Sequence, residues 1–149
     1  MKKILVMNGP NLNLLGTREP EKYGDKTLAD VEALCLATAS KHGYSLEFFQ
    51  SNHEGELIEK IHEAGKQFKE GQLKGVVFNP GAYTHTSIAL HDAIAGVGGL
   101  PVMEVHISNV YAREAFRHQS YVSPVAVGVL AGFGISGYSM AIEALIARS

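Results

Sequence analysis

The chain has 149 residues, of which 46% are hydrophobic and 19% are charged, with a formal net charge of −2. This length is typical of one domain with one core, and the hydrophobic fraction argues against an intrinsically disordered protein. The nearly neutral charge offers no basic surface for nucleic acid, so a small molecule or another protein is the expected partner. We therefore expect residues 1–149 to form a single domain.

The amino-terminal segment and the cysteine content indicate the cellular compartment of the protein. The opening MKKILVMNGP has too short an apolar run for a secretory signal, and no run of about 18 apolar residues occurs elsewhere. Cys35 is the only cysteine, which excludes an intrachain disulfide and a thiolate zinc cluster. We expect a soluble, cytoplasmic protein without a membrane partner.

Short apolar runs alternate with longer segments of helical period. The expected strands are residues 3–8, 44–50, 75–80, 101–108 and 123–132. The expected helices are residues 28–43, 55–71, 84–98 and 135–148, with a short helical turn at 112–118. Such alternation predicts parallel strands joined by right-handed crossovers, because a tight hairpin cannot join parallel strands. The strands read as continuous apolar runs, which a sheet covered on both faces requires. The predicted fold is a doubly wound, five-stranded α/β domain.

Capping residues and apolar periodicity define the helices further. Thr27 is expected to cap the first helix, and Thr84 or Thr86 the third. The expected inner faces carry Leu28, Val31, Leu34, Cys35 and Thr38 in the first helix, Leu57, Ile58, Ile61 and Phe68 in the second, and Met140, Ile142, Leu145 and Ile146 in the last.

Ligands of doubly wound sheets bind beyond the carboxyl ends of the strands, where the strand order reverses. Polar residues crowd the loops after the first, third and fourth predicted strands; they are Asn11, Arg18, Tyr23, Asn79, His85, His106, Ser108, Arg113 and Arg117. The first of these loops, GPNLNLLG, lacks the G-x-G-x-x-G pattern and has Pro10 where a free amide would be needed. A dinucleotide cradle is therefore not expected there, and Asn11 could equally satisfy the backbone of a turn.

The fourth strand, PVMEVHIS, carries the clearest chemical signal. Period two places Glu104, His106 and Ser108 on one side, so that Glu104 could orient the imidazole of His106. Arg113 and Arg117 are four residues apart, on one helical face, which suits a carboxylate or a phosphate but equally a solvated surface. No H-E-x-x-H or similar ligand pairing occurs, and no metal site is expected.

Residue types alone do not settle which group is the base. Histidine is the commoner acid–base residue near neutral pH, which favours His85 or His106 and leaves Tyr23 as packing in its loop.

Four long motifs together resemble the type II 3-dehydroquinate dehydratases. They are GPNLNLLGTREPEKYG, QSNHEGELIEKIHEA, NPGAYTHTSIALHDAI and EVHISNVYAREAFRHQSYVSPVAVGVLAGFG, in this order and covering most of the chain. The resemblance implies a flavodoxin-like domain in a homododecamer built as a tetramer of trimers. It also implies a hydro-lyase that converts 3-dehydroquinate to 3-dehydroshikimate by trans elimination through an enolate, in the shikimate pathway for aromatic amino acids or in quinate catabolism, with no cofactor or metal.

The resemblance also implies a role for each matching residue. Tyr23 would be the base and His106 the acid, with Arg18 as the transition-state stabiliser; Asn11 would help to hold a water, Glu104 would hold His106, and Arg113 would add positive charge. The implied substrate contacts are Asn79, His85, Arg117 and the amides of Ile107 and Ser108, with Asp92 from a neighbouring subunit. Arginine suits the stabilising role because it keeps its charge and cannot act as the base itself.

A flavodoxin-like module that binds a flavin or receives a phosphoryl group remains the alternative. A phosphoryl receiver needs aspartates after the first and third strands, where this chain has Asn8 and Asn79. The sequence therefore disfavours the receiver, and a colourless preparation would count against the flavin.

Overall fold

The computed structural model describes residues 1–17, 21 and 24–148. Its strands are β1 (Lys3–Asn8), β2 (Ser45–Gln50), β3 (Leu73–Asn79), β4 (Val102–His106) and β5 (Gly128–Ala131). Its α-helices are α2 (Leu28–Lys41), α3 (Glu54–Lys69), α4 (Ile88–Gly96) and α5 (Ser136–Ala147). The strands form one parallel sheet in the order β2-β1-β3-β4-β5, which confirms the predicted doubly wound α/β fold with its flavodoxin-like strand order.

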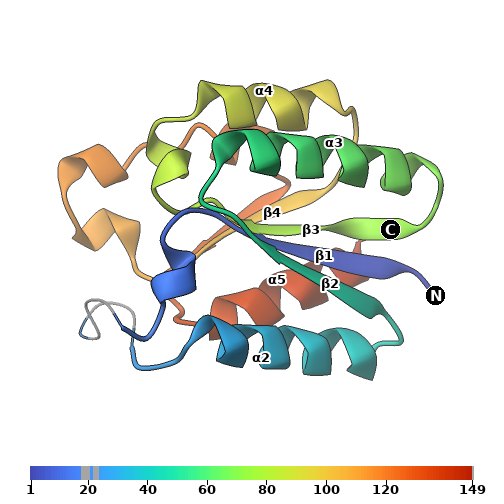
Figure 1. Ribbon diagram of the computed structural model, residues 1–149, viewed down its shortest axis with the longest axis horizontal. Helices are drawn as coiled ribbons and strands as arrows, with labels where there is room; N and C mark the ends of the chain where they lie inside the picture. The colour runs from blue at the N-terminus through green and yellow to red at the C-terminus, as the bar shows by residue number, and fades with distance from the viewer. Residues whose placement is uncertain (18–20, 22–23, 149) are drawn as a thin grey trace.

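The helices cover both faces of the sheet: α3 and α4 lie on one face, and α2 and α5 on the other (Figure 1). Strand β1 shows the consequence for its sequence. Ile4 and Val6 pack in the core beneath α2 and α5, whereas Leu5 and Met7 pack in the core beneath α3 and α4. Since successive side chains of a strand point to opposite faces, a strand buried on both faces needs a continuous apolar run.

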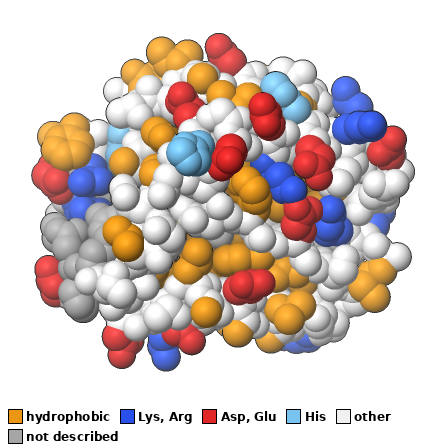
Figure 2. Space-filling view, in the orientation of Figure 1, with side chains coloured by type: hydrophobic (Ala, Val, Ile, Leu, Met, Phe, Trp, Pro, Cys, Tyr) orange, Lys and Arg blue, Asp and Glu red, His pale blue; other side chains and the backbone are white. Residues whose placement is uncertain are grey.

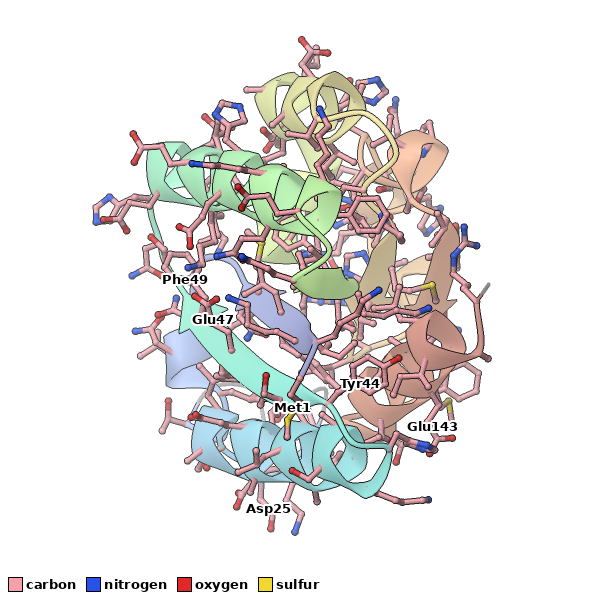
Figure 3. All side chains as sticks on the ribbon, turned by 90° about the vertical axis from the view of Figure 1, so that its right-hand side faces the viewer. Met1, Asp25, Tyr44, Glu47, Phe49 and Glu143 are labelled. Carbon is pink, nitrogen blue, oxygen red and sulfur yellow. The ribbon has the colours of Figure 1, made fainter. Side chains whose placement is uncertain are left out.

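Strand β2 is an edge strand and is only partly buried. Glu47 and Phe49, two residues apart, extend from it on the side of α3 (Figure 3). Lys60 of α3 pairs with the Glu47 carboxylate and lies 5.2 Å from the centre of the Phe49 ring, and Lys3 contacts the same carboxylate at 2.7 Å. A charged edge of this kind also discourages pairing with another strand.

The helix predictions were partly correct. Thr27 caps α2 as predicted, in a capping box where Asp30 N donates to the threonine hydroxyl and Thr27 N to the Asp30 carboxylate. The predicted cap of α4 was wrong, because Ser87, not Thr84 or Thr86, accepts the hydrogen bond from Leu90 N. In α5, Met140 is 41% exposed and does not belong to the core, unlike Ile142.

Two predicted segments divide into smaller elements. The strand expected at 123–132 begins with the 3₁₀ turn η5 (Ser123–Val125), because Pro124 near its start favours a turn, and only Gly128–Ala131 pairs with β4. The turn expected at 112–118 is two 3₁₀ turns, η3 (Val110–Ala112) and η4 (Ala115–Arg117), with an extended Arg113 between them. Arg113 and Arg117 therefore do not share one helical face.

The loops after β1 and β3 meet closely at the carboxyl end of the sheet, the left side of Figure 1. Gly9 N donates to Asn79 O at 2.8 Å, and a Cβ at Gly9 would lie 2.4 Å from Pro80 O. Gly81 follows with a φ of 61°, and a Cβ there would lie 3.0 Å from Pro10 O. Glycine at these positions lets the two backbones touch and form the floor of a pocket.

The face of the molecule drawn in Figure 2 carries side chains of both charges. Acidic and basic side chains alternate over the face shown in Figure 2, with no extended region of one sign. Among the described residues, no helix combines the length and the apolar character needed to cross a membrane.

Candidate active site

A pocket of about 180 Å³ opens at the carboxyl ends of β1, β3 and β4. It is lined by Pro10, Asn11, Leu12, Asn79, Gly81, Ala82, His85, His106, Ile107, Ser108, Val110, Arg113 and Arg117. Most of the predicted site residues are therefore brought together. Asp92 is exposed on α4 and does not line the pocket, and the predicted Arg18 and Tyr23 lie outside the described residues.

A short polar contact at the pocket wall joins Glu104 and His106. Both belong to β4 and are buried, and His106 Nε2 lies 2.5 Å from Glu104 Oε2. Burial opposes the charge on Glu104, but hydrogen bonds from His106, Ser123 and Thr84 outweigh it and hold the pKa of this carboxyl below its usual range. Because the carboxylate accepts the Nε2 proton, Nδ1 is the ring nitrogen left to exchange a proton with a ligand.

Three hydroxyl groups surround the same carboxylate. Thr84 Oγ1 lies 2.9 Å from Oε2 of Glu104, Ser120 Oγ lies 3.0 Å from that oxygen, and Ser123 Oγ lies 2.5 Å from Oε1. We call Thr84, Ser120 and Ser123 the hydroxyl ring. It supplies hydrogen bonds to the Glu104 carboxylate, which needs them because the side chain is only 1% exposed.

His85 lies beside His106 with its ring nearly parallel, at an interplanar angle of 17° and a centroid distance of 6.4 Å. Its Nδ1 donates to the carbonyl of Gln119 at 2.8 Å. Burial lowers the pKa of His85, and the positive charges of His106 and Arg117 lower it further, against the opposing hydrogen bond to Gln119. His85 is therefore a neutral histidine at neutral pH, with Nε2 available as an acceptor.

Glu114 links the two arginines of the pocket. Arg117 Nε donates to both carboxylate oxygens of Glu114 at 3.2 and 3.3 Å, and Arg113 Nε lies 3.7 Å from one of them. Arg113 also donates from Nη1 to the hydroxyl of Ser108 at 3.4 Å. The guanidiniums thus give the pocket positive charge suited to an anionic ligand or to charge that develops in a reaction.

Asn79 is held in the pocket floor by a buried network. The hydroxyl of Tyr138 accepts from Asn79 Nδ2 at 2.9 Å and donates to Asn8 Oδ1 at 2.7 Å, and Asn79 Oδ1 accepts from Gly81 N at 3.1 Å. These bonds leave one proton of the Asn79 amide available to a ligand. The network fixes the direction in which that proton points.

Asn11 adopts a left-handed conformation with a φ of 68°, unique among the non-glycine residues described. Its backbone N–H donates to Asn52 Oδ1 at 3.0 Å, and Asn52 is further held by Gln50 Nε2 at 3.2 Å. The hydrogen bond accounts for a backbone conformation that few side chains other than asparagine tolerate. It also keeps Asn11 at the rim of the pocket.

No group of three or more His, Cys, Asp or Glu side chains among residues 1–17, 21 and 24–148 could hold a metal ion. The thiol of Cys35 is buried, and burial raises its pKa to about 12, so it is unsuited to act as a nucleophile.

Several supporting residues were missed by the sequence interpretation. They are Asn52, the hydroxyl ring, Glu114 and Tyr138. Glu114 could have been inferred from its spacing to Arg117, which is three residues away. The others contact their partners over 16 to 130 residues of sequence, and no local pattern signals such contacts.

Fold and pocket together define a class: a flavodoxin-like α/β protein with a histidine–carboxylate pair and two arginines in a polar pocket at the switch in strand order. The family profile described as Dehydroquinase class II matches residues 2–146. The chain belongs to this family.

Individual relatives agree with this assignment. A 3-dehydroquinate dehydratase from Variovorax paradoxus (strain S110) is 65% identical, over 98% of this chain and 99% of its own length. One from Marinomonas sp. (strain MWYL1) is 62% identical, over 98% of this chain and 97% of its own. The crystal structure of type II dehydroquinase from Butyrivibrio crossotus DSM 2876 has a TM-score of 0.93 at 46% identity, covering 98% of each chain. The flavin or signalling alternative is not favoured.

Proposed function

We propose that this chain dehydrates 3-dehydroquinate to 3-dehydroshikimate, in the shikimate pathway for aromatic amino acids or in quinate catabolism. Family membership supports the substrate and the reaction. The structural observation that carries the proposal is the buried contact of 2.5 Å between His106 Nε2 and the Glu104 carboxylate at the pocket wall. This contact supplies an oriented proton donor where a leaving hydroxyl has to be protonated.

The reaction is an elimination through an enolate. The base removes the proton from the carbon next to the ketone, and the electron pair of that C–H bond forms the enolate. The enolate then returns its electrons to form a carbon–carbon double bond as the C–O bond of the hydroxyl breaks. His106 gives a proton to the departing oxygen, water leaves, and the product is a conjugated enone.

We assign the base to Tyr23, which the motif TREPEKYG supplies together with Arg18. Both lie outside the described residues, and the assignment depends on the motif. The positive charge of Arg113 in the pocket lining supports it, because a nearby guanidinium favours the anionic form of a tyrosine. Trans elimination needs Tyr23 and His106 on opposite faces of the substrate.

The remaining pocket residues suit the polar groups of the substrate. Asn79, neutral His85 and Arg117 can contact its hydroxyls, and the amides of Ile107 and Ser108 its carboxylate. Asn11 at the rim can hold a water against the enolate. We assign no cofactor to this chemistry, because acid, base and charge stabilisation all come from side chains.

We also propose that the chain assembles as a homododecamer, a tetramer of trimers, in the cytoplasm. Asp92 is exposed on α4 away from the pocket of its own chain, so its substrate contact requires a neighbouring subunit. Light scattering of the purified protein measures the molar mass, and a stable monomer with full activity would contradict this assembly.

The direct test follows enone absorbance after addition of 3-dehydroquinate. The wild-type chain should produce absorbance, and Tyr23→Phe should abolish its formation while circular dichroism stays that of the folded protein. Tyr121→Phe is a matched control, since Tyr121 does not line the pocket. Absence of turnover by the wild type would refute the function, and near-normal turnover by Tyr23→Phe would remove Tyr23 from the mechanism.

A further inference from the structure

Counting protons and lone pairs shows which groups donate and which accept in the hydroxyl ring around Glu104. Each hydroxyl has one proton to donate and two lone pairs that accept. Ser120 Oγ accepts hydrogen bonds from the backbone N–H groups of Val122, at 3.1 Å, and Ser123, at 3.0 Å. Both lone pairs of Ser120 are thereby occupied, so its hydroxyl acts only as a donor, with Thr84 Oγ1 at 2.7 Å and the two Glu104 oxygens at 3.0 and 3.1 Å as its acceptors.

The same count fixes the proton of Thr84. Its Oγ1 lies 2.7 Å from Ser120 Oγ, but Ser120 has no lone pair left to accept a proton from it. The proton of Thr84 therefore goes to Glu104 Oε2, at 2.9 Å. Ser123 donates to the other oxygen at 2.5 Å. Thr84 and Ser123 thus donate directly to the carboxylate, and Ser120 donates either to the carboxylate or to Thr84, which in turn donates to it.

Hydroxyl groups that donate to a carboxyl group stabilise its ionised form. Burial opposes ionisation of Glu104, which is 1% exposed, but these hydroxyls and His106 hold its pKa below the usual range, so that it is ionised at neutral pH with both oxygens fixed in direction. An ionised and fixed Glu104 can only receive the Nε2 proton of His106. The neutral form of His106 is then the tautomer with its proton on Nε2, and proton exchange with a ligand is confined to Nδ1.

We infer that Thr84, Ser120 and Ser123 are positioning residues for the proposed dehydration. Their protons hold Glu104 as an oriented anion, and Glu104 holds His106 so that Nδ1 delivers the proton to the departing hydroxyl. None of the three lines the 180 Å³ pocket, so their effect on catalysis passes through Glu104 and His106. The kinetic consequences of this inference rest on the proposed function, whereas the predicted tautomer of His106 does not.

The kinetic test is Ser123→Ala in the full-length chain. It removes one donor to Glu104 and leaves every pocket-lining residue in place. We expect kcat for 3-dehydroquinate to fall by about 10-fold with KM changed less than about 2-fold, because a group that acts on the acid affects the transition state more than substrate binding. Ser123→Thr keeps a hydroxyl and should recover most of the loss.

A second position keeps the test independent of how well one variant folds. Thr84→Val removes the proton donated to Oε2 with little change in side-chain volume, and Thr84→Ser retains it. The valine variant should lose kcat as Ser123→Ala does, and the serine variant should keep it.

The matched control is Ser87→Ala. Ser87 is buried and donates to the Glu54 carboxylate at 2.5 Å, but it caps α4 and does not line the pocket. This variant loses hydrogen bonds of the same kind, and its kcat should stay within about 2-fold of the wild type. An equal loss of kcat in Ser87→Ala and Ser123→Ala would reduce the hydroxyl ring to a structural role and overturn the inference.

The spectroscopic test needs no substrate. Long-range ¹H–¹⁵N NMR spectra of the imidazoles, with His106 assigned through His106→Asn, should show the Nε2–H tautomer in the wild type and a mixture in Ser123→Ala. An unchanged tautomer together with an unchanged kcat would overturn the inference. A shifted tautomer in a chain that does not dehydrate 3-dehydroquinate would support the positioning role and refute the proposed function.

Discussion

At the residue scale, Glu104 shows how a buried charge is maintained and what it contributes to stability. Its pKa lies below the ordinary value of 4.5, because hydrogen bonds from His106, Ser123 and Thr84 outweigh the opposing effect of burial. As pH falls below 4.5, the unfolded state takes up this proton before the folded state does. The stability that Glu104 contributes is therefore complete above pH 4.5 and is lost as pH falls through the lower folded value.

Glu104→Gln should remove this acid-dependent component. The variant should be less stable than the wild type at pH 7, because an amide NH₂ replaces an acceptor that faces several donors, and its free energy of unfolding should fall less steeply below pH 4.5. Urea unfolding at a series of pH values measures both effects. Glu59→Gln, at an exposed position of α3, is the control and should follow the wild type. Parallel curves for Glu104→Gln and the wild type would contradict the assignment.

Residue patterns predicted some of this site and could not predict the rest. Period two on β4 correctly placed Glu104 beside His106, because the two residues are adjacent on one side of a strand. Ser120 and Ser123 lie 16 and 19 residues beyond Glu104 and reach it only after the chain has turned twice through η3 and η4. Their contacts depend on tertiary structure and leave no periodic signal in the sequence.

At the scale of elements, the pocket floor depends on two loops in backbone contact. A methyl group at Gly9 would lie 2.4 Å from Pro80 O, and the loop cannot retreat without breaking the bond from Gly9 N to Asn79 O. Gly9→Ala should cost about 1–3 kcal/mol of stability, as overpacking does, and should lower activity by displacing Asn79. Gly55→Ala is the matched control: open space surrounds this position on α3, and the change should be neutral or stabilising by up to about 1 kcal/mol.

Thermal unfolding and enone formation measure this pair of variants. Equal stability and activity of Gly9→Ala and Gly55→Ala would show that the loops separate freely.

The secondary-structure predictions were correct where the cause is local in sequence and wrong where it depends on distant contacts. Apolar runs correctly predicted five parallel strands, whereas the cap of α4 and the beginning of β5 depend on what Thr84, Ser123 and Pro124 meet in the folded chain.

At the scale of the whole molecule, one hydroxyl joins distant parts of the fold. Tyr138 of α5 is fully buried and bridges Asn8 at the end of β1, 130 residues away, and Asn79 at the end of β3, 59 residues away. The bridge connects the core beneath α2 and α5 to the pocket floor. Burial raises the pKa of Tyr138 above its ordinary value of 10.0, although the hydrogen bond from Asn79 opposes the shift.

Tyr138→Phe should therefore change stability in two ways. At neutral pH it should cost about 1–3 kcal/mol, because the side chains of Asn8 and Asn79 lose their buried partner. Above pH 10 the unfolded wild type releases the proton of Tyr138 while the folded chain retains it, so the stability of the wild type falls as pH rises. The Tyr138→Phe variant lacks this proton, and its stability should therefore decline less steeply with pH. Cys35, whose pKa burial raises to about 12, is present in both proteins. Tyr111→Phe, at a position 66% exposed, should retain both the wild-type stability and its alkaline slope. Denaturant unfolding between pH 7 and pH 11 measures the effect, and identical slopes for Tyr138→Phe and Tyr111→Phe would show that Tyr138 does not hold its proton in the folded protein.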